Sequence, residues 1–510
     1  MKHRDTSLPP ELEEWRVKIE AWAREFGLDF YETIYEVLDW NEMNMVAAYG
    51  GFPNRYPHWR FGMEYDQLCK SYAYGLSKIY EMVINNDPCY AYLLYCNKIV
   101  DQKMVMAHVF GHCDFFKNNI YFGPTQKNMM DRMANHKTKV NRLIDQLGHD
   151  RVESFIDTCL SIENLIDYQL PFLKAKDSSI EPPTDPEEEA IDDIGARGDI
   201  IKLKNEKSYL ESYINPKLFL DEQRKKKREQ NKQKATFPSR PERDVMGFLL
   251  QYAPLRRWEA EILDLIREEA YYFAPQAQTK IMNEGWASYW HSTIMTRKAL
   301  TDGEVIDFAD NHSGTMAMGQ GRINPYKIGI ELYRHIEERW NKGQFGKAYD
   351  ECDDLVARKK WDKQLGLGRQ KIFEVRKIYN DVTFLDEFLT ADFCREYKLF
   401  AYEYNPMSKR YEISDRDFAM VKQKLLSQLT NFGQPIIEIV DANAGNRGEL
   451  HLKHRHEGMD LEIDYAQHTL QNLQAIWRRP VLIETKVGEQ TKIFKYDGEK
   501  HHSQDSLIGL

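Results

Sequence analysis

The stretch VMAHVFGHCDFF, residues 105–116, carries two histidines four positions apart in an otherwise apolar segment. An α-helix has about 3.6 residues per turn, so His108 and His112 would project from the same side of one helix. Two imidazoles in this arrangement can bind a metal ion, although most such pairs are ordinary core or surface histidines. The stretch therefore predicts a helix, and its interpretation as a metal site depends on a third ligand elsewhere in the chain.

The segment IMNEGWASYWHS, residues 281–292, offers the best third ligand. Glu284 precedes a run of small and aromatic residues that is typical of a helix, and a distant carboxylate commonly completes a site begun by two histidines. His291 would share a helical face with Glu284 but lie about 10 Å further along the axis. We therefore predict Glu284 as the third ligand, with His291 beside the ligands or facing a substrate.

The position after the first histidine is Val109, where the helices of many zinc peptidases carry the glutamate that activates the zinc-bound water. Valine cannot accept a proton, and Asp114 would lie roughly 240° around the helix from His108. Glu268 and Glu269, in the segment REEAYYF, are the candidates for a substitute base because this segment precedes the predicted third ligand. The alternative is that both are solvated charges on a helix surface.

The segment NHSGTMAMGQGRINPYKIG, residues 311–329, is rich in glycine and small residues and lacks the periodicity of a core element. It contains His312, Arg322 and Tyr326. A hydrogen-bond donor such as His312 or Tyr326 could stabilise an oxyanion opposite a metal ion. The alternative is a structural loop.

Further histidines lie outside these segments. His58, in RYPHWRFG, could line the same cleft or belong to a structural loop. In HLKHRH, residues 451–456, His454 and His456 would share one face of a strand and His451 would take the other. One joint metal site is therefore not expected there, and a solvated basic strand is the favoured interpretation.

The composition excludes several classes of protein. The chain has 510 residues and a formal charge of -10, so nucleic acid is not expected as a partner, because a phosphate backbone favours a basic surface. No apolar run approaches the roughly 18 residues of a membrane span, and the polar N-terminus lacks the apolar core of a signal peptide. Seven cysteines without a CxxC pair fit reduced thiols. We expect a globular cytoplasmic protein without a transmembrane segment.

Periodicity along the chain predicts mainly helix. Residues 11–170 follow helical patterns, apart from an ordered loop at residues 47–62. Helix resumes at residue 245 and continues, with breaks, to residue 388. The amphipathic segment at residues 254–275 is expected to end at Pro275.

From residue 396 the pattern changes to two hairpins with glycine or asparagine turns around one helix. The predicted fold class is therefore mainly α, with a helical domain at residues 1–395 and a small α+β domain at residues 396–510. Between the helical stretches, residues 181–193 hold seven carboxylates and residues 224–234 hold seven basic side chains. These segments are expected to be solvated, with a docking surface for a partner as the alternative.

Four segments together resemble the SpoVR family, stage V sporulation protein R. They are AAYGGFPNRYPHWRFG, VINNDPCYAYL, MAHVFGHCDFFKNN and NEGWASYWH, and the resemblance covers nearly the whole chain. It implies a role in forming the spore cortex, the peptidoglycan layer of bacterial endospores. It also implies action in the cytoplasm of the mother cell, with protein partners in sporulation, but no particular reaction.

The histidine pair followed by a distant EGWA helix also resembles helical zinc peptidases of the gluzincin kind, in which two histidines and a distant glutamate hold zinc. The resemblance implies a zincin-like helical domain with His108, His112 and Glu284 as zinc ligands. It fails at Val109.

Three functions remain open. The first is a metal-dependent hydrolase, peptidase- or amidase-like, that acts on a peptide or peptidoglycan-related substrate with an unusual base. Its candidate catalytic residues are Glu268, Glu269, His291, His312 and Tyr326. The second is an inactive zincin-like scaffold that binds partners in spore assembly. The third is a non-haem iron enzyme, which uses the same ligand types. Zinc is the expected metal and iron the alternative; the lack of a second carboxylate near the ligands would favour the scaffold.

Overall fold

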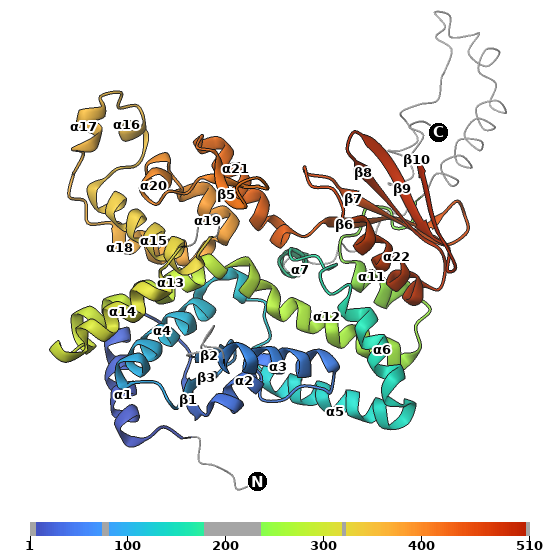
Figure 1. The fold of residues 1–510 in the computed structure, drawn as a ribbon, viewed down its shortest axis with the longest axis horizontal. Coiled ribbons are helices and arrows are strands. Elements are labelled where there is room, and N and C mark those ends of the chain that lie inside the picture. Colours follow the sequence, from blue (N-terminus) through green and yellow to red (C-terminus); the bar gives the residue numbers. More distant parts are fainter. Residues whose placement is uncertain (1–6, 74–80, 178–235, 319–322, 506–510) are drawn as a thin grey trace, which may run out of the picture. The chain divides into compact units, whose positions relative to one another are not determined.

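The computed structural model of the chain describes residues 7–73, 81–177, 236–318 and 323–505. The fold class is confirmed, because helices dominate these residues and a five-stranded sheet occupies the C-terminal region (Figure 1). The two charged segments, residues 181–193 and 224–234, lie outside the described residues, as does Arg322.

Contacts between residues divide the chain into two compact units. Unit 1 consists of Met1–Asp157 and Asp264–Gln434, and unit 2 consists of Thr158–Leu263 and Pro435–Leu510. This division differs from the expected boundary at residue 395. The change of period in the sequence marks where strands begin, whereas a compact unit is defined by the contacts between its residues. These contacts place Thr158–Leu263 in the same unit as the C-terminal strands.

Unit 1 is mainly helical. Its helices are α1 (Pro10–Glu25), α2 (Trp40–Ala48), α3 (Trp59–Ala73), α4 (Ile99–Asn118), α5 (Met129–Leu147), α13 (Lys280–Ile294), α14 (Val305–Thr315), α15 (Pro325–Lys342), α16 (Lys347–Asp350), α17 (Leu355–Lys359), α18 (Gly368–Ile378), α19 (Asp381–Phe388), α20 (Ala391–Glu396) and α21 (Phe418–Leu429). Shorter turns are η1 (Ile120–Phe122), η3 (Met295–Ala299), η4 (Asp302–Glu304) and η5 (Thr430–Gly433). Helices α6 (His149–Leu160) and α12 (Arg257–Gln278) have residues in both units.

Unit 1 also contains strands where helix was expected. Strands β1 (Thr33–Leu38), β2 (Glu81–Ile84) and β3 (Cys89–Leu94) form a sheet in the order β1-β3-β2, with β1 parallel and β2 antiparallel to β3. The prediction of helix through this region was wrong, because periodicity does not separate a short apolar strand from a buried helical segment. A second pair, β4 (Ala401–Asn405) and β5 (Arg410–Asp415), forms a hairpin.

The loop predicted at residues 47–62 is present, and it packs on the body of unit 1. Phe52 and Tyr56 are fully buried in it, and its last residues begin α3 at Trp59. The predicted helix end at Pro275 was wrong, since α12 continues through the proline to Gln278. Proline has a helical φ and removes only one backbone hydrogen bond, which the last turn of a long helix tolerates.

Helix α4 is buried along almost its whole length, including its polar residues. Nζ of Lys103 lies 2.8 Å from Oε1 of Glu304 and 3.6 Å from the centre of the Trp15 ring. Asp101 accepts a hydrogen bond from Asn311 of α14. Because each buried charge has a partner, α4 can carry polar groups through the core of unit 1.

Small residues bring α13 close to two other helices. A Cβ atom on Gly111 of α4 would lie 2.7 Å from Cα of Ala287, so α4 and α13 touch at their backbones there. A Cβ atom on Gly285 would lie 2.4 Å from Cα of Gly329 in α15. Helix α13 is therefore packed between α4 and α15, as Figure 1 shows.

Unit 2 has a mixed sheet in the order β10-β9-β8-β7-β6. Its elements are α7 (Leu170–Asp177), α11 (Val245–Tyr252), β6 (Ile436–Ala444), β7 (Glu449–Arg455), α22 (Ile463–Trp477), β8 (Val481–Val487), β9 (Gln490–Tyr496) and β10 (His501–Asp505). Both predicted hairpins, β6–β7 and β8–β9, are present, and Gly488 takes a positive φ of 62° in the second turn. Helix α22 connects the parallel strands β7 and β8.

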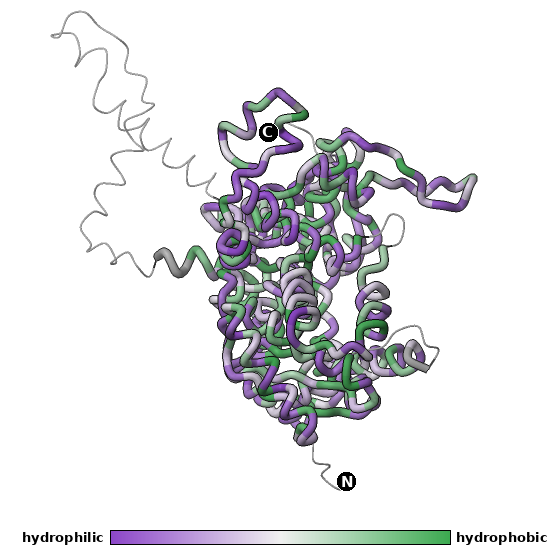
Figure 2. Tube along the Cα trace, turned by 90° about the vertical axis from the view of Figure 1, so that its left-hand side faces the viewer, coloured by the Kyte–Doolittle hydropathy of each residue, from purple (hydrophilic) through white to green (hydrophobic). Residues whose placement is uncertain are grey.

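Hydropathy changes over short distances along the chain. Figure 2 shows hydrophilic and hydrophobic residues interspersed through the described helices. No helix among the described residues is long and apolar enough to cross a membrane.

Candidate metal centre

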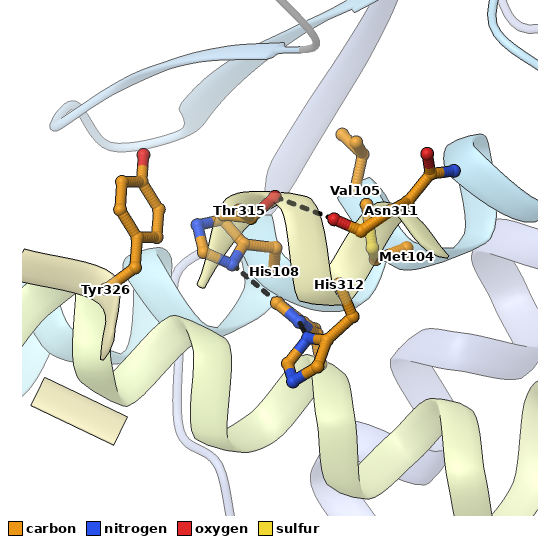
Figure 3. A pocket seen from close by; sticks show the side chains of 8 residues that line it. Met104, Val105, His108, Asn311, His312, Thr315 and Tyr326 are labelled. Atoms are coloured by element: carbon orange, nitrogen blue, oxygen red, sulfur yellow. Dashed lines mark hydrogen bonds between the residues drawn. The ribbon is translucent and has the colours of Figure 1, made fainter. Parts of the chain in front are cut away.

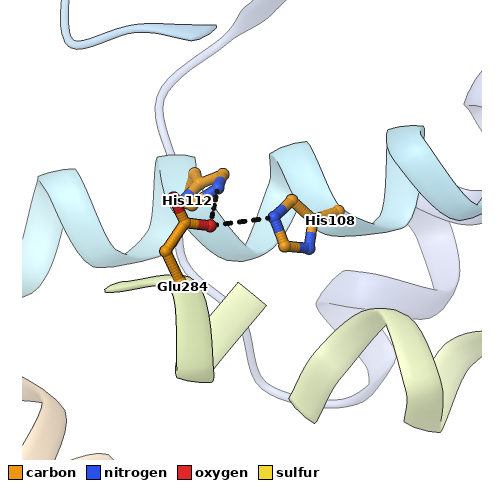
Figure 4. A group of neighbouring side chains, drawn as sticks. All are labelled: His108, His112 and Glu284. Atoms are coloured by element: carbon orange, nitrogen blue, oxygen red, sulfur yellow. Dashed lines mark ion pairs between the residues drawn. The ribbon is translucent and has the colours of Figure 1, made fainter. Parts of the chain in front are cut away.

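Three side chains that are distant in sequence meet where α4 packs on α13 (Figure 4). Nε2 of His108 lies 3.4 Å from Oε2 of Glu284, and Nε2 of His112 lies 3.5 Å from the same oxygen. One ligand atom from each residue lies within 4.8 Å of the other two. Both histidines are buried, and the side chain of Glu284 is 17% exposed. The predicted convergence of these residues is confirmed.

The donor atoms fit a transition-metal ion. Two ligands that bind zinc tetrahedrally at about 2.0–2.2 Å lie roughly 3.4 Å from each other. Oε2 of Glu284 is buried without a hydrogen bond, and an unsatisfied carboxylate oxygen in that setting is costly. Two imidazoles and a carboxylate are ligands of both zinc and non-haem iron. A divalent cation would therefore satisfy the three groups together.

The protonation of the site also suits a metal. Burial and the neighbouring His108 lower the pKa of His112 to about 4, so its imidazole is neutral. Burial alone raises the pKa of Glu284, but the contacts with His108 and His112 outweigh it and lower that pKa to about 2. A neutral imidazole and an ionised carboxylate are the forms that bind metals.

Asn283 orients one of the histidines. Its Oδ1 lies 2.8 Å from Nδ1 of His112. An amide oxygen only accepts, so Nδ1 of His112 donates and Nε2 keeps its lone pair toward Glu284. Metal-binding histidines are commonly oriented through the other ring nitrogen in this way.

A pocket of about 90 Å³ lies beside His108 (Figure 3). It is lined by Met104, Val105, His108, His291, Asn311, His312, Thr315 and Tyr326. The ring of Tyr326 lies 6.1 Å from that of His108. His291, His312 and Tyr326, which the sequence grouped with the site, are thus placed beside it.

Two hydrogen bonds connect His108 to the far side of this pocket. Nδ1 of His108 lies 2.9 Å from Nδ1 of His291, and Nε2 of His291 lies 3.1 Å from Nδ1 of His312. Burial and the neighbouring His108 hold the pKa of His291 well below its ordinary value. Burial and Arg334 lower the pKa of His312. Both rings are therefore neutral near pH 7.

The residues around Glu284 set its position. Gly285 and Ala287 are the small residues at the two close helix contacts of α13. Nε1 of Trp286 donates a hydrogen bond of 2.7 Å to Oδ2 of Asp114 on α4. The motif EGWA therefore combines one candidate ligand with three residues that fix the position of α13. The sequence predicted Glu284 as a ligand but not these packing contacts, whose signal is the pair of small residues on either side of Trp286.

Comparison with known proteins gives the family. A family model described as "SpoVR like protein" matches residues 7–434, and one described as "SpoVR-like C-terminal domain" matches residues 435–488. The chain belongs to the SpoVR family. It is 27% identical over 498 residues to the "Uncharacterized protein YcgB" of Escherichia coli (strain K12), covering 93% of this chain and 91% of that protein. No solved structure matches the chain significantly.

Membership of the SpoVR family confirms the resemblance found in the sequence and implies a role related to sporulation. The two family models meet at residues 434 and 435, where unit 1 also gives way to unit 2. The boundary between the two family models therefore coincides with one change of compact unit, although the first model also includes Thr158–Leu263 of unit 2.

The structure of this SpoVR chain places Glu268 and Glu269 in a separate cluster. The carboxylate of Glu269 lies 2.8 Å from a guanidinium nitrogen of Arg55 and 2.9 Å from Nδ1 of His136. Glu268 lies 3.2 Å from Nε2 of His136 and pairs with Arg132. Both carboxylates are engaged by basic side chains, so their placement does not support the expected role as a base at the metal site.

Two further residues of α4, Val109 and Asp114, are buried among structural contacts. Val109 is fully buried in the apolar core. Asp114 accepts hydrogen bonds from Trp286, from the backbone N–H of Asp29 at 2.7 Å and from Arg376 at 2.5 Å. Burial raises the pKa of Asp114 to about 6. These contacts agree with the expectation that Asp114 does not replace the missing glutamate.

The remaining histidines belong to other environments. Nε2 of His58 lies 3.2 Å from Asp157. His454 is buried in unit 2 and bonds to Oγ1 of Thr485 at 2.8 Å, so the interpretation of its strand as solvated was wrong at this position. Strand alternation explains it, because His454 lies on the core face of β7 with Leu450 and Leu452.

Proposed function

We propose that this protein binds a divalent transition metal, zinc in the first place, through His108, His112 and Glu284, and that it uses this centre in forming the spore cortex. The observation that supports metal binding is Oε2 of Glu284, which is buried without a hydrogen bond between two imidazole nitrogens at 3.4 and 3.5 Å. Membership of the SpoVR family supports the role in sporulation. Action in the cytoplasm of the mother cell, on or beside peptidoglycan precursors, is part of this proposal.

Different residues of the chain have different roles at the proposed metal centre. A bound zinc ion would supply Lewis acidity and lower the pKa of a bound water to about 7. Asn283 and His291 orient the two candidate histidine ligands through hydrogen bonds to Nδ1 of His112 and Nδ1 of His108, respectively. His312 and Tyr326 line the adjoining pocket, where an imidazole and a phenol can hold polar groups of a peptide or peptidoglycan-related ligand.

The placement of the carboxylates favours binding over peptidase-like turnover. Among the described residues, Glu284 is the one carboxylate in the group that could hold a metal. Glu268 and Glu269 are paired with Arg132, His136 and Arg55. We therefore rank a metal-containing scaffold, which binds a partner or substrate in spore assembly, ahead of a hydrolase with a carboxylate base.

A non-haem iron enzyme is the second candidate. Two histidines and one carboxylate with open positions are the ligand set of iron(II) oxygenases, and that chemistry needs no glutamate beside the metal. Among the described residues, the group that could hold a metal contains Glu284 and no second carboxylate, and this ligand set favours the iron enzyme as the second candidate.

Metal analysis of the full chain, purified without chelator, tests the proposal. We expect close to one equivalent of zinc in the wild-type protein and in Glu268→Gln, and none in Glu284→Gln. Iron in place of zinc would select the second candidate. A folded wild-type chain that holds no metal and takes up neither zinc nor iron would overturn the proposed centre.

A further inference from the structure

The three imidazoles of His108, His291 and His312 form a continuous chain across α4, α13 and α14. The nitrogens that face each other are Nδ1 and Nδ1 at 2.9 Å, then Nε2 and Nδ1 at 3.1 Å. A hydrogen bond between two ring nitrogens needs one proton, carried by one of them, and a neutral imidazole has one N–H. The direction of the first hydrogen bond therefore fixes the direction of the second.

If each ring carries one proton, only two arrangements satisfy both hydrogen bonds. In the inward arrangement His312 donates to His291, His291 donates to Nδ1 of His108, and His108 carries its proton on Nε2, 3.4 Å from Glu284. In the outward arrangement His108 donates from Nδ1, His291 donates to His312, and His312 carries its proton on Nε2. A metal ion on Nε2 of His108 is compatible with the outward arrangement alone, because a ligand nitrogen cannot keep its proton.

We infer that metal binding reverses the direction of this histidine chain, and that His291 is the positioning residue through which the metal centre sets the tautomer of His312. This inference rests on the proposed metal centre. In the reversal the two shared protons pass from His291 to His108 and from His312 to His291, the proton on Nε2 of His108 is released to solvent, and Nε2 of His312 takes up one proton from the pocket, so each ring still carries one proton. The inward arrangement is the metal-free state, since a proton on Nε2 of His108 then points toward the ionised Glu284.

The surroundings fit a chain with two discrete states. His291 is buried, with 4% of its surface exposed, so the loss of either of its hydrogen bonds would be costly. The ring of His312 stacks on Phe308 at 5.5 Å, and α14 is tied to α4 by the hydrogen bond between Asn311 and Asp101. The three rings can therefore keep their positions while the shared protons move from one ring nitrogen to the next.

The consequence appears in the pocket that His312 lines. In the metal-loaded state its Nε2 carries a proton and donates, which suits a carboxylate or carbonyl oxygen of a peptide-like ligand. In the metal-free state the same nitrogen accepts. The pocket would thus prefer an acceptor group once the centre holds its metal.

Zinc affinity, measured with zinc alone against a competing chelator, tests His291 as a positioning residue. His291→Phe removes both hydrogen bonds, and we expect an affinity about 10–100-fold below wild type. His291→Asn keeps an amide oxygen near the position of Nδ1, so Nδ1 of His108 still has an acceptor and the affinity should recover most of this loss. A role in packing alone would favour the phenylalanine variant over the asparagine variant.

Nitrogen NMR of the wild-type chain, with histidines labelled with ¹⁵N, tests the reversal without any variant. We expect the proton of His312 on Nδ1 in the zinc-free protein and on Nε2 in the zinc-loaded protein. The same tautomer in both states, or equal zinc affinity in folded His291→Phe and wild type, overturns this inference and leaves the metal centre standing. A wild-type chain that binds neither zinc nor iron overturns both.

Discussion

Unit 1 holds two buried groups of histidine and glutamate that differ in one respect. Around His136, the carboxylates of Glu268 and Glu269 are balanced by Arg132 and Arg55. Around Glu284, Oε2 of the carboxylate lies 3.4 and 3.5 Å from two imidazole nitrogens and has no hydrogen bond. Since buried charge must be compensated, the first group is complete and the second is complementary to a cation from outside. The same residue types therefore form a compensated cluster in one place and the proposed metal centre in the other.

The cluster at His136 explains how part of the loop at residues 47–62 is held in place. Arg55 lies in this loop, and its guanidinium also stacks over the rings of Tyr56 and Phe61 at 5.2 and 4.8 Å. Its ion pair with Glu269 ties the loop to α12, while His136 adds α5. The loop is thus tied to two helices of unit 1, α12 and α5, and Arg55 belongs to this cluster and not to the proposed metal centre.

The largest expected effect is on stability, from breaking the compensated cluster. Glu269→Ala leaves Arg55 buried without its carboxylate, and the side chains of the pair are only 7% and 6% exposed. We expect a loss of about 3–5 kcal/mol in the free energy of unfolding, measured by denaturant titration, with zinc binding retained. A loss below about 1 kcal/mol, within the range of exposed ion pairs, would contradict the structural role.

The next prediction distinguishes the proposed metal centre from the cluster around His136 by its effect on zinc affinity. Glu284→Gln should lower zinc affinity by more than the 10–100-fold typical of outer partners of a metal site, because an amide is a poor ligand. The stability of the metal-free protein should not fall, since the amide removes a buried charge that has no cation. If Glu284→Gln unfolds the metal-free chain as Glu269→Ala does, Glu284 is a structural residue and the comparison fails.

Zinc itself should stabilise the protein through this centre. At a free concentration 100 times the dissociation constant, zinc adds about 2.7 kcal/mol to the free energy of unfolding. Thermal unfolding with and without zinc should show this shift in wild type and in Glu269→Ala, and no shift in Glu284→Gln. An equal shift in all three proteins would place the stabilising site elsewhere.

The smallest effect concerns pH. Burial alone lowers the pKa of His136, but its hydrogen bonds to Glu268 and Glu269 outweigh burial and raise that pKa. A raised folded pKa gives stability that is complete below the unfolded value of about 6.5 and is lost as pH rises through the folded value. The stability difference between wild type and His136→Gln should therefore shrink from about pH 6 toward alkaline pH. A difference that grows with pH would contradict the charged state of His136.

The sequence by itself determined the features that depend on local spacing. The spacing of four positions from His108 to His112 places both imidazoles on one side of a helix, and the alternation after residue 435 gives the two hairpins of unit 2. Ligand chemistry then singled out Glu284, and the convergence of the three residues followed. Spacing also separated Asp114 from the site, because six residues along a helix turn a side chain away from His108.

Only the tertiary structure decided what depends on packing between distant segments. The helical period predicts the direction in which Glu268 and Glu269 each point from their helix. Their partners Arg55, Arg132 and His136 lie more than 130 positions away in the sequence. Helix α13 reaches α4 because Gly111 and Ala287 let two backbones touch, a contact that neither segment shows alone. The strand β1 pairs with β3 across about fifty residues, so its short apolar run read as helix. Local periodicity fixes which way a side chain points from its own element, whereas close packing of whole elements fixes what it meets.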